Sequence, residues 1–186
     1  MDPVPTPSQT VGPFFHFSLT TEAHSIRCIA GPRAQGERIW VCCRVFDGEG
    51  SLVDDAMIEI WQADAEGVYT LPERADPEFR GFGRLATGED GSCEFETIKP
   101  GRVPGPGGTP QAPHLEVAVF ARGMLKQLFT RIYFAGDAAN KEDYVLSLVP
   151  RDRRETLLAH PDPARKGRWR FDLRLQGEQE TVFFDV

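Results

Sequence analysis

The sequence predicts an all-β fold, a single-domain β-sandwich with short helices and long loops. Several runs of strand length are rich in β-branched and aromatic residues. Clusters of Gly and Pro separate these runs, a pattern that is typical of a sandwich built from short strands. With 186 residues and 40% hydrophobic content, the chain can bury one large core without disulfide bonds.

The predicted strands follow one another along most of the chain. The first covers residues 38–46, a β-branched and aromatic run that ends in a Gly-containing turn. Further strands are expected at 56–62, 116–120 and 128–134, and a last one at 181–185. Their short length and regular separation favour antiparallel neighbours in a sandwich.

The clearest alternation lies between residues 168 and 175, where apolar side chains occupy the odd positions and charged side chains the even ones. Helix signals are weak, and only 140–144 and 151–159 could hold short helices. Residues 100–113 are rich in Pro and Gly and are expected to form a loop, because proline cannot donate a hydrogen bond within a central strand.

Two divisions of the chain are expected. Residues 1–13 contain four Pro together with Ser, Thr and Gln, and would form an extended arm without a core of its own. Residues 14–186 would form the sandwich domain. The four cysteines contain no Cys-x-x-Cys pair and are interpreted as small buried side chains rather than a zinc or redox site.

Composition excludes several classes of function. A net charge of −7 and a pI near 5.1 argue against a nucleic-acid partner, which normally requires a basic face. No apolar stretch approaches the length of a membrane span, and the amino terminus lacks the apolar segment of a signal peptide. We therefore expect a soluble, cytoplasmic protein without a membrane partner.

The pair His114 and Glu116 is the strongest chemical signal. Side chains two residues apart in a strand share a face, so two imidazoles at this spacing could bind one metal ion. Here the second position is a carboxylate. A new site built from His114, Glu116 and a third group is chemically possible, but the sequence indicates no third ligand. The other histidines, His16, His24 and His160, are isolated.

Several stretches, in order and over nearly the whole chain, resemble the intradiol ring-cleaving dioxygenases. Each is weak alone, and together they are specific. They include Thr6-Pro-Ser-Gln-Thr-Val-Gly-Pro13, Glu59-Ile-Trp-Gln-Ala-Asp64, Thr97-Ile-Lys-Pro-Gly101, Ala112-Pro-His114, Phe120-Ala-Arg-Gly123, Thr130-Arg-Ile-Tyr-Phe134 and Arg170-Phe-Asp-Leu-Arg-Leu-Gln-Gly177. The resemblance implies the β-sandwich of that family, which binds one non-haem Fe(III) through two tyrosines and two histidines.

Carried onto this sequence, the family's metal ligands are mostly lost. One tyrosine position is Val103, the first histidine is kept as His114, and the second histidine has become Glu116. The loop 71–75, where the family has its other tyrosine, contains none, and Tyr69 matches a different family position. We therefore expect these three to be vestigial ligand positions, with no metal and no catalytic residue in this chain alone. The pattern resembles the iron-free α subunit of heteromeric family members, whose β subunit carries Fe(III).

The same resemblance implies that this chain completes a substrate pocket at its interface with the β subunit. The residues expected there are Thr10, Gly12, Pro13 and Arg122. Thr10 offers a hydroxyl group, and Gly12 allows the backbone to approach the substrate closely. Pro13 offers an apolar edge to the aromatic ring. Arg122 could present its guanidinium to a substrate carboxylate. The alternatives are that the arm only docks on the partner and that Arg122 is an ordinary exposed turn residue.

The function implied by the resemblance is O2-dependent intradiol cleavage of protocatechuate to 3-carboxy-cis,cis-muconate, a step of aromatic catabolism, by αβ units that oligomerise further. This chain would orient the substrate and exclude water, which are effects on positioning rather than on bond-making. Two alternatives remain open at this point. One is a stand-alone intradiol dioxygenase acting on catechol or hydroxyquinol, and the other is a non-catalytic β-sandwich binding or scaffold module.

Overall fold

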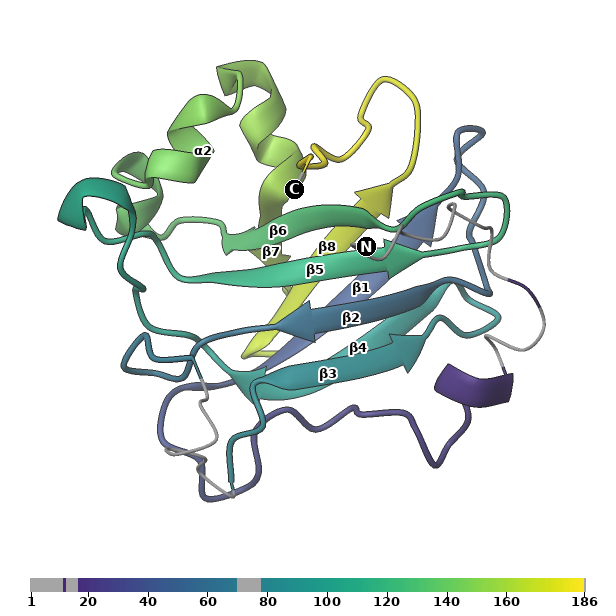
Figure 1. Cartoon of the computed structure of the whole chain (residues 1–186), viewed down its shortest axis with the longest axis horizontal. Helices are drawn as coiled ribbons and strands as arrows, with labels where there is room; N and C mark the ends of the chain where they lie inside the picture. Colours follow the sequence, from purple (N-terminus) through teal and green to yellow (C-terminus); the bar gives the residue numbers. More distant parts are fainter. Residues whose placement is uncertain (1–11, 13–16, 70–77, 186) are drawn as a thin grey trace, which may run out of the picture.

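Strands dominate the computed structural model, which describes residues 12, 17–69 and 78–185 (Figure 1). Eight strands hydrogen-bond in the order β3-β2-β5-β6-β7-β8-β1-β4. Their bounds are β1 Arg38–Phe46, β2 Met57–Trp61, β3 Phe82–Ala86, β4 Ser92–Ile98, β5 His114–Phe120, β6 Leu128–Phe134, β7 Leu158–Pro161 and β8 Arg168–Arg174. The predicted all-β fold is therefore confirmed.

The strands form two layers that share the short strand β7. Figure 1 shows β6, β5, β2 and β3 in front, with β8, β1 and β4 crossing behind them. Strand β7 pairs in parallel with β6 and antiparallel with β8, over two residue pairs in each case. This bridging strand turns the sheet from one layer into the other, so that a single core is enclosed between them.

The core follows directly from the alternation of the strands. In β1 the odd positions 39 to 45 are completely buried, and in β8 Phe171 and Leu173 are buried while their neighbours are not. Phe95 of β4 lies in the same cluster with no exposed surface. Gly83 in β3 has no room for a side chain, since an added Cβ would lie 2.9 Å from the Phe95 ring. The two layers are therefore packed closely at this point.

Short helices pack against β6. They are η3 Ala138–Lys141, α2 Tyr144–Leu148 and η4 Arg151–Leu157, whereas η2 Pro106–Gly108 lies in the loop before β5. A second apolar cluster joins the three helices to the sheet, and its buried members are Ala112, Tyr133, Leu146, Val149 and Leu157. Strand β5 buries Leu115, Val117 and Val119 in the core, and on its other face His114 and Ala118 are buried while Glu116 is 38% exposed.

Several expectations from the sequence require correction. The helix expected over 151–159 ends at Leu157, because the next residues pair as β7 between β6 and β8. The strand expected at 181–185 contributes one isolated bridge, between Phe184 and Phe129. All four cysteines are free, but Cys28 is exposed instead of buried. Over residues 17–69 and 78–185, no helix is long and apolar enough to cross a membrane.

Replacing Phe95 with alanine tests the packing between the layers. Because its ring is fully buried, we expect the free energy of unfolding to fall by about 3–5 kcal/mol, measured by urea denaturation. Leu148→Ala is the control, since Leu148 is 66% exposed and should change stability by less than about 0.5 kcal/mol. Similar losses for both variants would contradict the assignment of Phe95 to the core.

Candidate functional site

His114 lies at the start of β5 with its imidazole buried. Its Nδ1 is 2.7 Å from the Ala112 carbonyl oxygen. A carbonyl oxygen only accepts, so Nδ1 carries the proton and donates it. The other nitrogen, Nε2, lies 3.3 Å from Glu116 Oε1 but is buried without a hydrogen bond of good geometry. The retained histidine thus points its available nitrogen at the position where the family has its second histidine.

Glu116 is held by an arginine from the neighbouring strand. In the register of β5 and β6, Glu116 is directly opposite Arg131, and Arg131 Nη2 lies 2.7 Å from Glu116 Oε1. The same guanidinium donates from Nη1 to Gln111 Oε1 at 2.7 Å and to the Tyr133 hydroxyl at 3.3 Å. Arg131 is therefore fixed by three side chains on one side of the sheet.

The pKa of Glu116 reports the balance of these contacts. Partial burial favours the neutral acid and acts to raise the pKa, whereas the contacts with His114 and Arg131 favour the carboxylate. The contacts outweigh burial, so the pKa of Glu116 is below its ordinary value. The carboxylate and the guanidinium therefore form an ion pair at neutral pH.

Two buried residues, Tyr133 and Asp143, hold this cluster in position. The Tyr133 hydroxyl donates to Asp143 Oδ1 at 3.1 Å, and Asp143 also accepts from the backbone N–H groups of Ala112 and Leu146, both at 2.7 Å. Burial raises the pKa of Tyr133 far above its ordinary value, so the phenol stays protonated. Asp143 caps helix α2 and anchors the segment that carries the Ala112 carbonyl, and it thereby orients His114.

Two further residues complete the surroundings. Val103, at one vestigial tyrosine position, is buried, and its side chain provides no atom that could bind a metal. Tyr69 lies close enough to Glu116 and Arg131 for their charges to act on it, and burial followed by the charge of Glu116 raises the pKa of its phenol. The sequence analysis did not connect Tyr69, Arg131 or Gln111 with this site.

These residues do not fit a ferric ion. His114 supplies one donor nitrogen, Val103 supplies none, and Glu116 is already neutralised by Arg131. The permanent positive charge of Arg131 lies where it would repel a cation. Over the described part of the chain, no three His, Cys, Asp or Glu side chains converge on a common point. The donor set is thus incompatible with the family's iron site, and no third group joins His114 and Glu116.

Arg122 occupies a different part of the molecule. It follows β5 in the turn that leads to β6, its side chain is 76% exposed, and its Nε contacts Asp55 Oδ2. His114 begins β5, so the two side chains are separated by roughly 25 Å along the strand. Gly12 is exposed, with open space around it. Thr10 and Pro13 lie outside the described residues.

The structure therefore separates Arg122 from His114 and Glu116. Arg122 is exposed beyond the end of β5, whereas His114 is buried at its start.

Comparison with solved structures defines the class of fold. The dioxygenase domain of a carbohydrate-binding fusion protein from Streptomyces sp. SirexAA-E superposes with a TM-score of 0.65 and 28% identity, covering 94% of this chain and 99% of that one. Hydroxyquinol 1,2-dioxygenase from Pseudomonas putida DLL-E4 gives a TM-score of 0.66 at 19% identity, over 93% of this chain and 68% of that one, a likeness of fold alone. The class is the intradiol dioxygenase β-sandwich.

Sequence comparison then gives the family. The family profile described as Dioxygenase matches residues 10–177, and the chain belongs to the intradiol dioxygenase family, whose enzymes use non-haem iron. It is 45% identical to the protocatechuate 3,4-dioxygenase alpha chain of Burkholderia cepacia, over 97% of both chains. It is 44% identical to the protocatechuate 3,4-dioxygenase alpha chain of Pseudomonas putida, over 97% of this chain and 96% of that one. The beta chain of Burkholderia cepacia is 32% identical, over 94% of this chain and 77% of that one.

Replacing Glu116 with glutamine tests the ion pair. Because the native pKa of Glu116 is lower than the ordinary value of 4.5, its stabilising contribution is present above about pH 4.5 and disappears as pH falls through the native pKa. We expect Glu116→Gln to be less stable than the parent by about 1–3 kcal/mol near pH 6, which is less than for a fully buried pair because Glu116 is 38% exposed. The difference should shrink towards pH 3, measured by urea unfolding across this range.

Glu142→Gln serves as the matched control for this experiment. The Glu142 carboxylate is 67% exposed and pairs with Arg102 at 3.2 Å, so its removal should change stability by at most about 1 kcal/mol. A Glu116→Gln deficit that stays constant down to pH 3 would show that the charge of Glu116 is not the source of its contribution.

Proposed function

We propose that this chain is the iron-free α subunit of a protocatechuate 3,4-dioxygenase. The observation that carries the proposal is similarity to two alpha chains of that enzyme over 97% of this chain, combined with an Arg131–Glu116 ion pair at the family's metal position. A partner chain related to the beta relative would hold the Fe(III). The αβ units would assemble further and work in the cytoplasm.

The division of labour follows from what each chain can supply. In the partner, ferric iron would supply the centre at which the catechol and O2 react, and the aromatic ring would open between its two hydroxylated carbons to give 3-carboxy-cis,cis-muconate. This chain contributes no ligand to that centre. Its share is to complete the wall of the partner's pocket, to orient the substrate carboxylate and to exclude water.

Arg122 is the residue of this chain best placed for that role. Asp55 contacts its Nε, and the side chain extends from the turn after β5. A guanidinium held at Nε presents the two remaining nitrogens as a fork, which matches the geometry of a carboxylate. Because the side chain is 76% exposed and remote from His114, the carboxylate that it binds would lie in a pocket of the partner.

The amino-terminal arm would supply the other contacts. Thr10, Gly12 and Pro13 are proposed to extend over the same pocket, as a hydroxyl donor, a close backbone approach and an apolar edge. Gly12 is exposed with open space around it, as a residue reserved for a partner would be. The arm would then be a separate functional unit, 1–13, beside the sandwich domain 14–186.

Iron content provides the first test of the proposal. The chain purified alone should contain less than about a tenth of an iron per chain, because its donor set lacks the required ligands. The complex with its partner should contain about one iron per αβ unit, absorb in the visible region and cleave protocatechuate. Metal analysis and visible absorption measure this. Stoichiometric iron and activity in the lone chain would instead support the stand-alone dioxygenase, and a partnerless, inactive chain would support the binding module.

Arg122→Gln tests the carboxylate contact in the assembled enzyme. Loss of one charged, bidentate contact should raise KM for protocatechuate roughly tenfold or more. KM for catechol, which has no carboxylate, should change by less than about twofold. Steady-state kinetics with both substrates measure the difference.

Lys126→Gln is the matched control, because Lys126 lies in the same turn and loses the same charge. Asp55→Asn is a second comparison, because it removes the charge that holds Arg122. It should raise KM for protocatechuate by less than Arg122→Gln does, and it should leave KM for catechol unchanged. Equal changes for both substrates in Arg122→Gln would contradict a carboxylate contact while leaving the iron test unaffected.

A further inference from the structure

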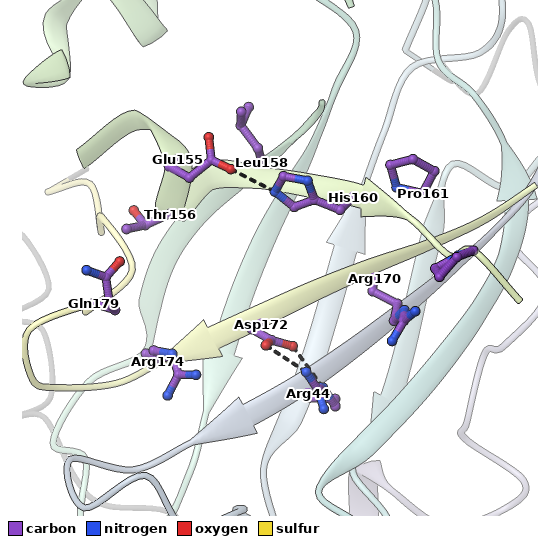
Figure 2. A pocket seen from close by; sticks show the side chains of 11 residues that line it. Arg44, Glu155, Thr156, Leu158, His160, Pro161, Arg170, Asp172, Arg174 and Gln179 are labelled. Atoms are coloured by element: carbon purple, nitrogen blue, oxygen red, sulfur yellow. Dashed lines mark hydrogen bonds and ion pairs between the residues drawn. The ribbon is translucent and has the colours of Figure 1, made fainter. Parts of the chain in front are cut away.

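A groove crosses the outer face of the second layer, far in the sequence from the Arg131–Glu116 pair. It has a volume of about 540 Å³ and lies where β7, β8 and β1 meet helix η4 (Figure 2). In β8 the charged residues that line it alternate with buried Phe171 and Leu173, so they face away from the core. The polar side chains that matter for its chemistry are Arg44, Glu155, His160, Arg170, Asp172 and Arg174.

Both carboxylates that line the groove have partners within it. Arg44 and Asp172 form two parallel contacts, Nε to Oδ1 at 2.8 Å and Nη2 to Oδ2 at 2.7 Å. His160 Nε2 lies 2.9 Å from Glu155 Oε1, and Figure 2 shows both pairs with their dashed contacts. Asp172 is therefore neutralised by Arg44, and Glu155 is directed to His160 rather than to an arginine.

Arg174 is the uncompensated cation of the groove. Within the described residues its guanidinium has no acidic partner, and it lies 4.6 Å above the Phe46 ring. Stacking on an aromatic face holds the guanidinium while its N–H groups remain available. An arginine held in this way is suited to binding an anion from solution.

Arg170 belongs to a network with more arginines than carboxylates. Its Nη2 lies 3.0 Å from Asp162 Oδ1, but Asp162 also pairs with Arg168 at 2.8 Å. Arg168 and Arg165 in turn share Glu94. Three guanidinium groups thus meet two carboxylates. On a chain with a net charge of −7, this face carries a local positive surplus that favours anions.

The spacing of the two cations selects the kind of anion. Arg170 and Arg174 are four residues apart on the same face of β8, which places their Cα atoms roughly 13 Å apart. A single small anion would meet one of them, whereas a linear molecule with a carboxylate at each end can meet both through their long side chains. Between them on β8 lies Asp172, which is already paired with Arg44, and Leu158 and Pro161 of β7 add apolar surface to the lining of the groove (Figure 2).

We propose that this groove is a binding site for a small linear dicarboxylate, with one carboxylate on Arg174 and the other on Arg170. This site is separate from the His114–Glu116 pair and from Arg122. The ring-opened product of the proposed reaction belongs to the same chemical class, and that connection alone rests on the proposed function. The binding site itself is tested without any measurement of activity.

Isothermal titration of the full chain with cis,cis-muconate tests the site. Saturable binding of one muconate per chain is expected, and Arg174→Gln should weaken it roughly tenfold or more, since a charged hydrogen-bond donor is lost. The cis,cis isomer of sorbate, (2Z,4Z)-hexa-2,4-dienoate, is the matched ligand, because it has the same six-carbon cis,cis diene with a single carboxylate. It should bind roughly tenfold more weakly than muconate.

Arg80→Gln is the matched protein control, since Arg80 is an exposed arginine next to β3, at the other end of the strand order. It removes the same charge and should leave the affinity for muconate within about twofold. Equal weakening by Arg80→Gln and Arg174→Gln, or equal affinity for the cis,cis isomer of sorbate and muconate, would overturn the proposal. The proposal would also be overturned if Arg174→Gln bound muconate with unchanged affinity but no longer co-purified with the partner chain. That result would show that the groove is a protein interface.

Discussion

The packing of β5 into the core is the constraint on which the rest of this structure depends. Leu115, Val117 and Val119 face the core between the layers, and on the other face His114 and Ala118 are buried while Glu116 is partly exposed. A strand buried in this way cannot slip by one residue without moving every apolar side chain to the wrong face. The register with β6 is therefore fixed, and it places His114 opposite Tyr133 and Glu116 opposite Arg131.

That register also explains how a charged residue is accommodated on β5. A partly buried carboxylate beside a buried imidazole would be costly without a positive charge nearby. Arg131 supplies it from the adjacent strand, as a permanent monovalent cation that forms directed hydrogen bonds. The Tyr133–Asp143 contacts then join the same residues to the helices. The cluster around His114 is thus part of the structural support of the sandwich.

Two further groups of arginines lie on the surface of the chain. Arg122 extends from the turn after β5, and the arginines of β8 face outward from the opposite layer. Both are guanidinium groups that are held at one side, by Asp55 or by Phe46, and open at the other. Such groups bind carboxylates without reorganising, because the ordering of the side chain has already occurred on folding.

The sequence by itself determined the strands with clear alternation, the loop at 100–113 and the shared strand face of His114 and Glu116. These features are local, since side-chain period, proline content and residue identity can be read without knowing what packs against them. The spacing of Arg131 and Tyr133, two residues apart within a predicted strand, was a signal that both side chains share a face. It could not identify the residues opposite them.

Only the tertiary structure decided the partners: Arg131 for Glu116, Asp143 for Tyr133, Asp55 for Arg122, and the arginine groove between β8 and β1. It also decided that residues 158–161 extend as β7 and that the carboxyl-terminal run forms a single bridge. The physical reason is that alternation specifies which face of a strand is buried, whereas pairing and register arise from contacts between segments distant in the chain. The His114–Glu116 pair could thus be found from sequence, but the arginine that pairs with Glu116 could not.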